Sequence, residues 1–309
     1  RLDAPIPNFM EESIMKLRKL VSVAMAGVMT LSLAACGGSG TADTTAAPAS
    51  TEAAADTTAA DKAADTSAAE SETSAEAQAA GGHFIVGFDQ EFPPMGFMGD
   101  NGEYTGFDLE LAQEVAKRLG LEYQPQPIIW DTKDMELDSG NIDCIWNGFT
   151  MTGRESDYEW TEAYMANSQV FVVAADSGIA SMDDLKGKVV ECQADSSALA
   201  ALNENPDLTA TFKQLLTTAD YNSAFMDLEQ GAVDAIAMDV IVAGYQIQQR
   251  NADFVILEDH LSAEEYGVGF KKDNTELRDK VQKTLEEMAQ DGTLKAISEK
   301  WFGEDVTTI

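Results

Sequence analysis

Apolar residues are distributed unevenly along the chain, and their spacing divides it into three parts. A basic segment at residues 15–19 precedes an almost uninterrupted apolar run at residues 20–33. Residues 37–82 then contain no aromatic and no large aliphatic side chain. From residue 83 onward, apolar positions recur with the spacing of strands and helices, so only this last part predicts a folded body.

The first half of the body alternates strand and helix signals. Residues 84–88 predict a buried strand, and residues 107–120 predict an amphipathic helix because Leu111, Val115 and Leu119 are four apart and Gly120 follows. Strands are expected at residues 121–124 and 142–146, with a short helix near 134–137 between them. This alternation favours an α/β fold in which parallel strands are covered by helices.

The second half repeats the scheme. Strands are expected at 170–174 and 188–192, a helix from Ser196, and a helix at 225–231 followed by a strand at 232–238. A glycine and then an aspartate at the entry to an apolar strand occur twice, as Gly140 with Asp143 and as Gly231 with Asp234. The echo suggests two similar α/β lobes, closed by an amphipathic helix at 277–290.

The segment before the body has the pattern of a lipoprotein signal. The apolar run is shorter than the roughly 20 residues of a bilayer span, and small residues lead to Cys36. We expect a signal peptide at 15–35, lipidation of Cys36, and residues 1–14 upstream of the initiator Met15; the alternative is a plain secretory signal with a chance cysteine. Residues 36–82 are expected to form a disordered tether, because they lack apolar groups to offset the entropy of ordering.

Composition narrows the classes of partner. The chain has 54 acidic and 20 basic residues, a formal net charge of −34, which disfavours binding to nucleic acid or anionic lipid. Cys144 and Cys192 lie in apolar runs and are expected to be buried thiols and not a disulfide. With two histidines and no cysteine pair at ligand spacing, no metal or cofactor is expected.

Seven short stretches follow one another in an order typical of one family. They are VGFDQEFPPM at 86–95, YTGFDLELA at 104–112, SGNID at 139–143, TMTGR at 150–154, DLKGKV at 184–189, GAVDAIAMD at 231–239, and DGTL at 291–294 with WFG at 301–303. With these the chain resembles the amino-acid-binding family (family 3) of periplasmic-type solute-binding proteins, the receptors of ABC importers.

The resemblance implies a type II two-lobe fold, with a mostly parallel sheet flanked by helices in each lobe and two hinge strands between them. Residues 83–172 plus 266–309 would form lobe 1, and residues 173–265 lobe 2. An amino acid would bind in the cleft, where such pockets are expected. The implied protein is an exported, lipid-anchored monomer that delivers its ligand to the permease subunits of an ABC importer.

For the ligand's carboxylate, the resemblance assigns Arg154, because a guanidinium grips a carboxylate with two hydrogen bonds. Thr150, Ser196 and Ser197 would assist it. Thr152-Gly153-Arg154 is one residue shorter than the family's usual spacing, and Arg154 could instead be a surface residue at a helix start.

For the ligand's ammonium, the resemblance assigns Asp239, with Asn147 and Gly148 as further acceptors. A buried unpaired charge costs several kcal/mol, so the cleft must supply an anion there. Asp239 could instead cap the helix that follows it.

The rings of Phe92 and Trp130 would sandwich the ligand's side chain, although Trp130 could equally belong to the core. Asp89 would face the far end of the ligand and select a cation or an amide donor. Asp195 stands where the family usually has glycine, and its charge favours a basic ligand. The sequence leaves lysine, arginine, histidine, glutamine and cystine open.

Two rivals remain. A few relatives of this fold are exported enzymes of the cyclohexadienyl dehydratase type, for which Asp89, Glu91 or Asp239 would act as the general acid or base. A sensory domain would usually continue into a transmembrane helix and a signalling module, whereas this sequence ends soon after Gly303. The complete amino-acid clamp favours a receptor without catalytic activity.

Overall fold

The computed structural model describes residues 82–250 and 252–309. The expected upstream segment, signal peptide, lipidation site at Cys36 and tether up to residue 81 lie outside the described residues.

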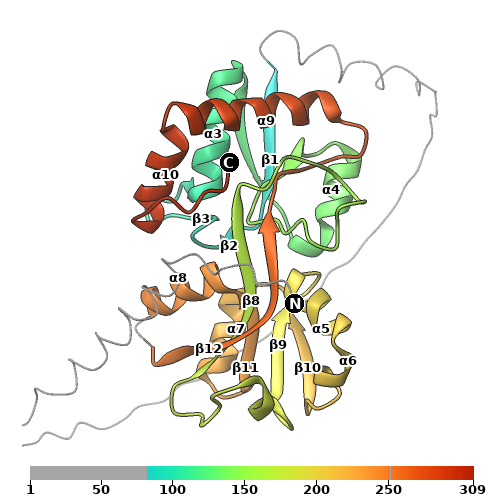
Figure 1. The fold of residues 1–309 in the computed structure, drawn as a ribbon, viewed down its shortest axis with the longest axis vertical. Helices are drawn as coiled ribbons and strands as arrows, with labels where there is room; N and C mark the ends of the chain where they lie inside the picture. The colour runs from blue at the N-terminus through green and yellow to red at the C-terminus, as the bar shows by residue number, and fades with distance from the viewer. Residues whose placement is uncertain (1–81, 251) are drawn as a thin grey trace, which may run out of the picture.

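Two five-stranded sheets form the body, one in each half of Figure 1. The first has the order β5-β1-β6-β13-β7, with β1 parallel to β5 and β6 and with β13 antiparallel to its neighbours. Its strands are β1 (His83–Phe88), β5 (Glu122–Pro127), β6 (Cys144–Ile145), β7 (Glu159–Trp160) and β13 (Gly269–Phe270). The helices of this lobe are α3 (Phe107–Leu119), η2 (Trp130–Thr132), α4 (Lys133–Ser139), α9 (Thr275–Gln290) and α10 (Thr293–Phe302), and a small meander consists of β2 (Glu91–Phe92), β3 (Gly96–Met98) and β4 (Tyr104–Thr105).

The second sheet has the order β10-β9-β11-β8-β12, with β9 parallel to β10 and β11 and with β8 antiparallel to β11 and β12. Its strands are β8 (Met165–Ala174), β9 (Val189–Gln193), β10 (Gln214–Thr218), β11 (Ala235–Asp239) and β12 (Phe254–Tyr266). The helices are η3 (Met182–Leu185), α5 (Ser197–Glu204), α6 (Pro206–Thr209), α7 (Tyr221–Glu229) and α8 (Val240–Arg250). The expected α/β fold with one helix-flanked sheet in each lobe is confirmed. The sheets are mixed and not mostly parallel: each has two parallel and two antiparallel pairs of neighbouring strands, because β13 in the first sheet and β8 in the second run against their neighbours.

The repeated aspartate has the same role in both lobes. The Ile85 N–H donates to Asp143 Oδ2 at 2.7 Å, and the Asp143 N–H donates to the Ile85 carbonyl at 2.8 Å. In the second lobe the same pair of bonds joins Val189 and Asp234, both at 2.8 Å. Each aspartate thus ties the loop before one strand to the neighbouring parallel strand, which explains why the motif occurs twice.

Two long strands join the lobes. β8 and β12 pair antiparallel from Met165 opposite Tyr266 to Ala174 opposite Phe254, and they cross from one lobe to the other in Figure 1. The boundaries expected at 172/173 and 265/266 fall within β8 and near the end of β12.

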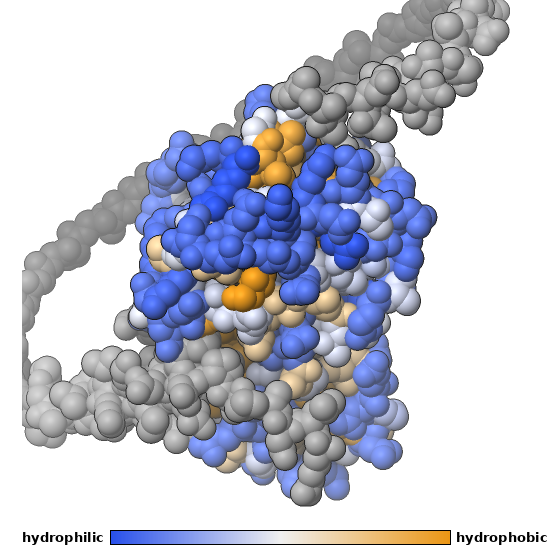
Figure 2. Space-filling model, turned by 45° about the horizontal axis from the view of Figure 1, so that its top comes forward, coloured by the Kyte–Doolittle hydropathy of each residue, from blue (hydrophilic) through white to orange (hydrophobic). Residues whose placement is uncertain are grey.

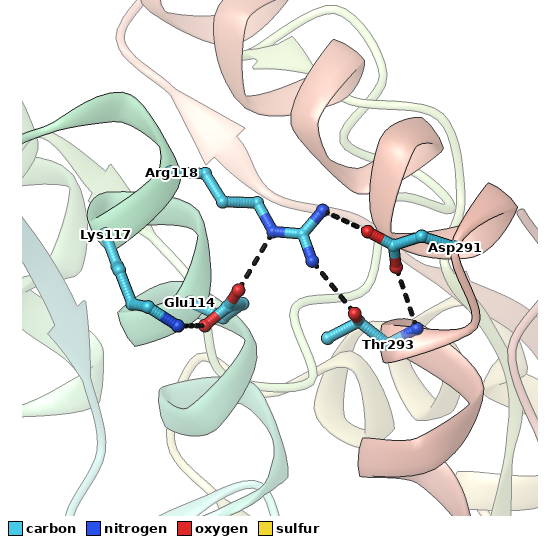
Figure 3. A network of polar contacts seen from close by, with 5 residues as sticks. All are labelled: Glu114, Lys117, Arg118, Asp291 and Thr293. Carbon is cyan, nitrogen blue, oxygen red and sulfur yellow. Dashed lines mark hydrogen bonds and ion pairs between the residues drawn. The ribbon is translucent and has the colours of Figure 1, made fainter.

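Helix α3 has the bounds that its apolar spacing predicts. Leu111 and Val115 are fully buried, and Gly120 ends the helix in the left-handed conformation at φ +71°. Arg118 fixes the end of α3 against the turn between α9 and α10: its Nη1 donates to Asp291 Oδ2 at 2.7 Å and its Nη2 to Thr293 Oγ1 at 2.8 Å (Figure 3). The C-terminal helices therefore complete lobe 1.

The face in Figure 2 is dominated by hydrophilic side chains, with hydrophobic residues in isolated spots. Among the described helices, none has both the length and the apolar character needed to span a membrane. Cys144 and Cys192 are buried and free, as expected.

Candidate functional site

A small polar cavity lies between the two lobes. Its lining consists of Phe92, Trp130, Asn147, Gly148, Thr150, Arg154, Gln193, Ser196, Ser197 and Asp239. The volume is about 10 Å³, which leaves room for about one water molecule, so the lobes are drawn together in this conformation. All the residues expected to bind ligand line this cavity except Asp89 and Asp195.

Arg154 reaches the cavity despite the shortened spacing before it. The turn closes through the Arg154 N–H, which donates to the Met151 carbonyl at 2.8 Å, with Gly153 at φ +82°. Arg154 Nη1 donates to the Thr150 carbonyl at 3.3 Å, and Nη2 donates to the Asp195 carbonyl of lobe 2 at 3.1 Å. These bonds occupy two of five N–H groups, so donors remain for a carboxylate.

The hydroxyl groups expected near the carboxylate come from both lobes. Ser196 is the N-cap of α5, where its Oγ accepts the Leu199 N–H at 3.1 Å. Thr150 Oγ1 of lobe 1 shares a hydrogen bond of 3.2 Å with Ser197 Oγ of lobe 2. An anion at this helix N-terminus is favoured by the free N–H groups of its first turn.

Asp239, the last residue of β11, is buried and lines the cavity. Its Oδ1 accepts three side-chain hydrogen bonds, from Asn167 Nδ2 at 2.7 Å, Gln169 Nε2 at 2.9 Å and Tyr266 Oη at 2.6 Å. Burial raises the pKa of Asp239, and the hydrogen bond from Tyr266 opposes this rise. Asp239 is therefore a buried carboxyl group that three donors orient in the second lobe, and Arg154 lies in the wall contributed by the first.

Asn147 and Gly148 also line the cavity. Asn147 is 1% exposed, and within the described residues neither its Oδ1 nor its Nδ2 has a hydrogen-bond partner. Such a group is costly to leave unpaired, so it suits a ligand. Gly148 has φ +56°, donates its N–H to Asp108 Oδ2 at 2.5 Å, and would bring a Cβ within 3.1 Å of the rings of Phe92 and Tyr266. Only glycine fits there.

Phe92 and Trp130 belong to the cavity wall and to the core at once. Phe92 packs against Tyr221 of lobe 2 with ring centroids 6.0 Å apart, and Trp130 meets Phe149 edge to face at 5.5 Å. Both are under 10% exposed. Trp130 therefore packs in the core, as one alternative expected, and also lines the cavity, where a ligand-binding ring would lie.

Asp89 does not line the cavity, contrary to the direct contact expected from the sequence. Gln193 of lobe 2 stands in front of it and donates Nε2 to Asp89 Oδ2 at 2.6 Å and to the Ala219 carbonyl at 2.9 Å. Burial raises the pKa of Asp89 to about 6, against the lowering effect of hydrogen bonds from the Glu91 N–H and Gln193. With both amide hydrogens used, the polar atom that Gln193 can offer a ligand is its carbonyl oxygen.

Gln193 was missed by sequence reasoning. A usable signal was present, because Gln193 directly follows the strand predicted at 188–192 and precedes Ala194-Asp195-Ser196, and ligands bind at the carboxyl ends of such parallel strands.

Asp195 is engaged by a lysine that the sequence did not point to. Lys133 Nζ of α4 forms an ion pair with Asp195 Oδ2 across the lobes and lies 5.2 Å from the centroid of the Trp130 ring. The Lys133 side chain is 2% exposed, whereas that of Asp195 is 53% exposed. The negative charge expected at the cleft mouth is therefore already paired. Beyond the pair lies a second, polar cavity of about 340 Å³, whose wall includes Lys133, Arg154 and Asp195.

Comparison with known proteins agrees with this geometry. Residues 84–304 match the family model described as bacterial extracellular solute-binding proteins, family 3. The "L-cystine-binding protein TcyJ" of Escherichia coli (strain K12) is 35% identical over 229 residues, which cover 73% of this chain and 85% of that protein.

Solved structures show the same fold. An ABC uptake transporter substrate-binding protein from Streptococcus pneumoniae with bound histidine gives a TM-score of 0.74 at 35% identity, covering 77% of this chain and 99% of the other. An ancestral arginine-binding protein bound to glutamine gives a TM-score of 0.67 at 37% identity, covering 72% and 99%.

Proposed function

The chain belongs to the bacterial extracellular solute-binding proteins of family 3, and from this premise we propose that it is the amino-acid receptor of an ABC importer. It captures a polar amino acid between its lobes and delivers it to the permease in the membrane.

The observation that carries this proposal is the placement of Arg154 and Asp239 around one cavity, each from a different lobe. A zwitterion needs a cation for its carboxylate and an anion for its ammonium if it is to leave water. Because each lobe brings one of the two, binding strengthens as the lobes close, which couples capture to the conformation that the permease recognises.

The chemistry of the far end favours a ligand with hydrogen-bond donors. Gln193 has its nitrogen committed to Asp89 and Ala219, so its carbonyl oxygen is the atom available to a guanidinium, ammonium, imidazole or amide group. The negative charge of Asp89 behind it supports a cation. The ligand is therefore a basic or amide amino acid, in line with the bound histidine and glutamine of the two solved structures.

Cystine is the second candidate. Cystine has two amino-acid head groups, and the second could meet the Lys133–Asp195 pair, which lines the second cavity; Arg154 lines both cavities. If the pair opened, it would offer one ammonium and one carboxylate to a second zwitterionic head. The similarity to TcyJ supports this candidate.

The test is identification of the ligand. Native mass spectrometry of residues 82–309 gives the mass of any co-purified amino acid, and calorimetry with L-arginine, L-histidine, L-glutamine and L-cystine ranks the candidates. The proposal requires at least one of them to bind and to be recovered chemically unchanged. Conversion of the bound compound would instead support the enzyme of the dehydratase type.

We further propose that the protein is exported and held at the outer face of the cell membrane by a lipid on Cys36. The chain Gly37–Gly82, which has no apolar group suited to packing, would let the receptor diffuse near the permease as a monomer. Cys36→Ala should move the protein from the detergent phase to the aqueous phase in a partition assay without changing ligand affinity. Retention in the detergent phase would mean that the apolar segment at residues 20–33 is the anchor.

A further inference from the structure

β12, one of the two strands that join the lobes, contains a second buried carboxyl group close to Asp239, the residue proposed to bind the ligand's ammonium. Glu264 of β12 is 6% exposed and is absent from the cavity wall. Its Oε1 accepts hydrogen bonds from Thr150 Oγ1 at 3.0 Å, Asn167 Nδ2 at 2.6 Å and Gln169 Nε2 at 2.7 Å. Thr150 belongs to lobe 1, while Asn167 and Gln169 belong to β8.

Glu264 and Asp239 share their donors. Asn167 Nδ2 lies 2.6 Å from Glu264 Oε1 and 2.7 Å from Asp239 Oδ1, and Gln169 Nε2 lies 2.7 Å and 2.9 Å from the same two oxygens. Two carboxyl oxygens that lie against the same two amide nitrogens are close neighbours. Two full negative charges at that separation in a buried site repel strongly, so one proton on the pair is favoured.

The groups that face the pair supply no compensating cation. Tyr266 of β12 donates to Asp239, and Tyr221 of α7 and Tyr266 both have pKa values raised well above the ordinary value, chiefly by burial, so both stay neutral. Within residues 82–250 and 252–309, no lysine, arginine or histidine forms an ion pair with either carboxyl group. Arg154 shares the cavity with Asp239 but directs its two observed bonds to backbone carbonyls.

We propose that Glu264 is a positioning residue of the ammonium site: it holds one proton with Asp239 in the unliganded protein and releases it when the ligand's ammonium binds. The proposal rests on the proposed function, because it needs an amino acid whose ammonium meets Asp239. On binding, the O–H bond of Glu264 breaks and its proton goes to solvent, while the ligand keeps its own ammonium protons.

Two further observations support this division of roles. Burial raises the pKa of Glu264, and the charge of Asp239 raises it further. Both carboxyl groups accept from Asn167 and Gln169, but Asp239 alone accepts from the Tyr266 hydroxyl, and that bond opposes the rise in the pKa of Asp239. Thr150 extends the link to the carboxylate site, since its hydroxyl donates to Glu264 while its carbonyl accepts from Arg154.

The decisive experiment counts protons released on binding. L-arginine and L-glutamine are titrated at pH 7 in phosphate, HEPES and Tris, and the slope of the observed enthalpy against the buffer's ionisation enthalpy gives the proton number. These probes are chosen because neither the guanidinium nor the amide titrates near neutral pH. We expect the parent to release about 0.5 to 1 proton on binding. Its Kd should then fall by up to tenfold for each unit that the pH rises, in the range where release is complete.

The variants are Glu264→Gln and Glu265→Gln. The first keeps the shape and an oxygen acceptor for Thr150 but cannot ionise, so it should bind with no proton release by this residue and a flat dependence on pH between 7 and 8, above the range in which Asp89 titrates. Glu265 is the next residue on β12 and is exposed, so its variant should behave as the parent. Binding by the parent without proton release, or equal release by Glu264→Gln, would overturn the proposal.

A ligand-free measurement separates this proposal from the proposed function. A carboxyl group that keeps its proton in the folded state lowers the stability of the fold as pH rises, because the folded chain then binds more protons than the unfolded one. The parent should therefore lose stability between pH 5 and pH 8 relative to Glu264→Gln in urea unfolding. Parallel curves for the two proteins would contradict the held proton even if none of the amino acids bound.

Discussion

Gln193 Nε2 donates a 2.6 Å hydrogen bond to Asp89 Oδ2 across the two lobes, and this bond fixes which end of the Gln193 amide can face the ligand. Under the proposed function, Gln193 would contact the far end of the ligand, and Asp89 would act through it. The arrangement converts a negative charge behind the cavity into an oriented hydrogen-bond acceptor in its wall.

Asp89→Asn should weaken binding of a basic ligand about tenfold. The new amide can donate to the Gln193 oxygen, which turns the Gln193 nitrogen toward the ligand and forfeits a charge-assisted contact of about 1.5–3 kcal/mol. Calorimetry at moderate salt with L-arginine measures the loss, and L-glutamine should lose less. Asp176→Ala, in an exposed turn, is the control. Equal losses for both ligands would mean that Asp89 orients Gln193 without sensing charge.

The same residue predicts a pH dependence. Because the pKa of Asp89 is raised to about 6, mainly by burial, its charge is present above that pH and lost below it. The affinity of the parent for L-arginine should fall by about tenfold in total as pH is lowered through 6 and Asp89 becomes protonated, and Asp89→Asn should lack this component. Glu264 adds its own dependence nearer neutrality, so the comparison is between the two proteins at each pH. Superimposable profiles would remove Asp89 from ligand recognition.

Arg154→Ala should raise Kd at least 100-fold for every amino acid that binds, because it leaves the ligand's carboxylate without its bidentate partner in a nearly dry cavity. Arg154→Lys should fall between the variant and the parent, since a lysine keeps the charge but not the fork of donors. Lys186→Ala, at an exposed position, controls for net charge. A Kd within threefold of the parent would show that the shortened turn before Arg154 directs it away from the ligand.

Local patterns in the sequence predicted the parts of the fold that depend on neighbours along the chain. The four-residue spacing and Gly120 located α3, and the repeated aspartates marked the entry to β6 and β11, because each of these signals acts within one or two elements. The apolar pattern did not predict β12, because its sequence mixes charged and apolar residues; only the resemblance implied a second hinge strand, near the boundary at 265/266.

The site was predictable where a family motif marks it and obscure where partners meet only in three dimensions. Arg154 and Asp239 lie in motifs, whereas Lys133 reads as an ordinary helix residue until Asp195, 62 positions later, is placed against it. Asp89 lies 104 positions before Gln193, so no spacing indicated that one would screen the other from the cavity.

The repeated aspartates give a prediction about the stability of each lobe. Asp143→Ala should lower the free energy of unfolding by about 1–3 kcal/mol, because the half-buried Ile85 N–H loses its acceptor. Asp234→Ala removes the matching bond to Val189 and should act on the other lobe. Urea unfolding gives the magnitude, and hydrogen exchange should show faster exchange around β1 for the first variant and around β9 for the second. Exchange spread equally over both lobes would contradict two separately stabilised sheets.

The unequal burial of Lys133 and Asp195 predicts that their truncation has unequal effects on closure. Asp195→Asn leaves an ammonium group that is 2% exposed without its anion in the closed state, so closure becomes costly and Kd should rise about tenfold or more. Lys133→Met leaves the Asp195 carboxylate, which is 53% exposed and can return to water, so Kd should change less than threefold.

The Asp195→Asn variant changes the charge and little else. Asparagine tolerates the left-handed conformation of Asp195 at φ +56°, and the backbone carbonyl that accepts from Arg154 is retained. The double variant should bind like Lys133→Met, because removing the lysine removes the unpaired charge. Additive losses in this cycle, measured by calorimetry, would show that the two residues stabilise the closed state independently.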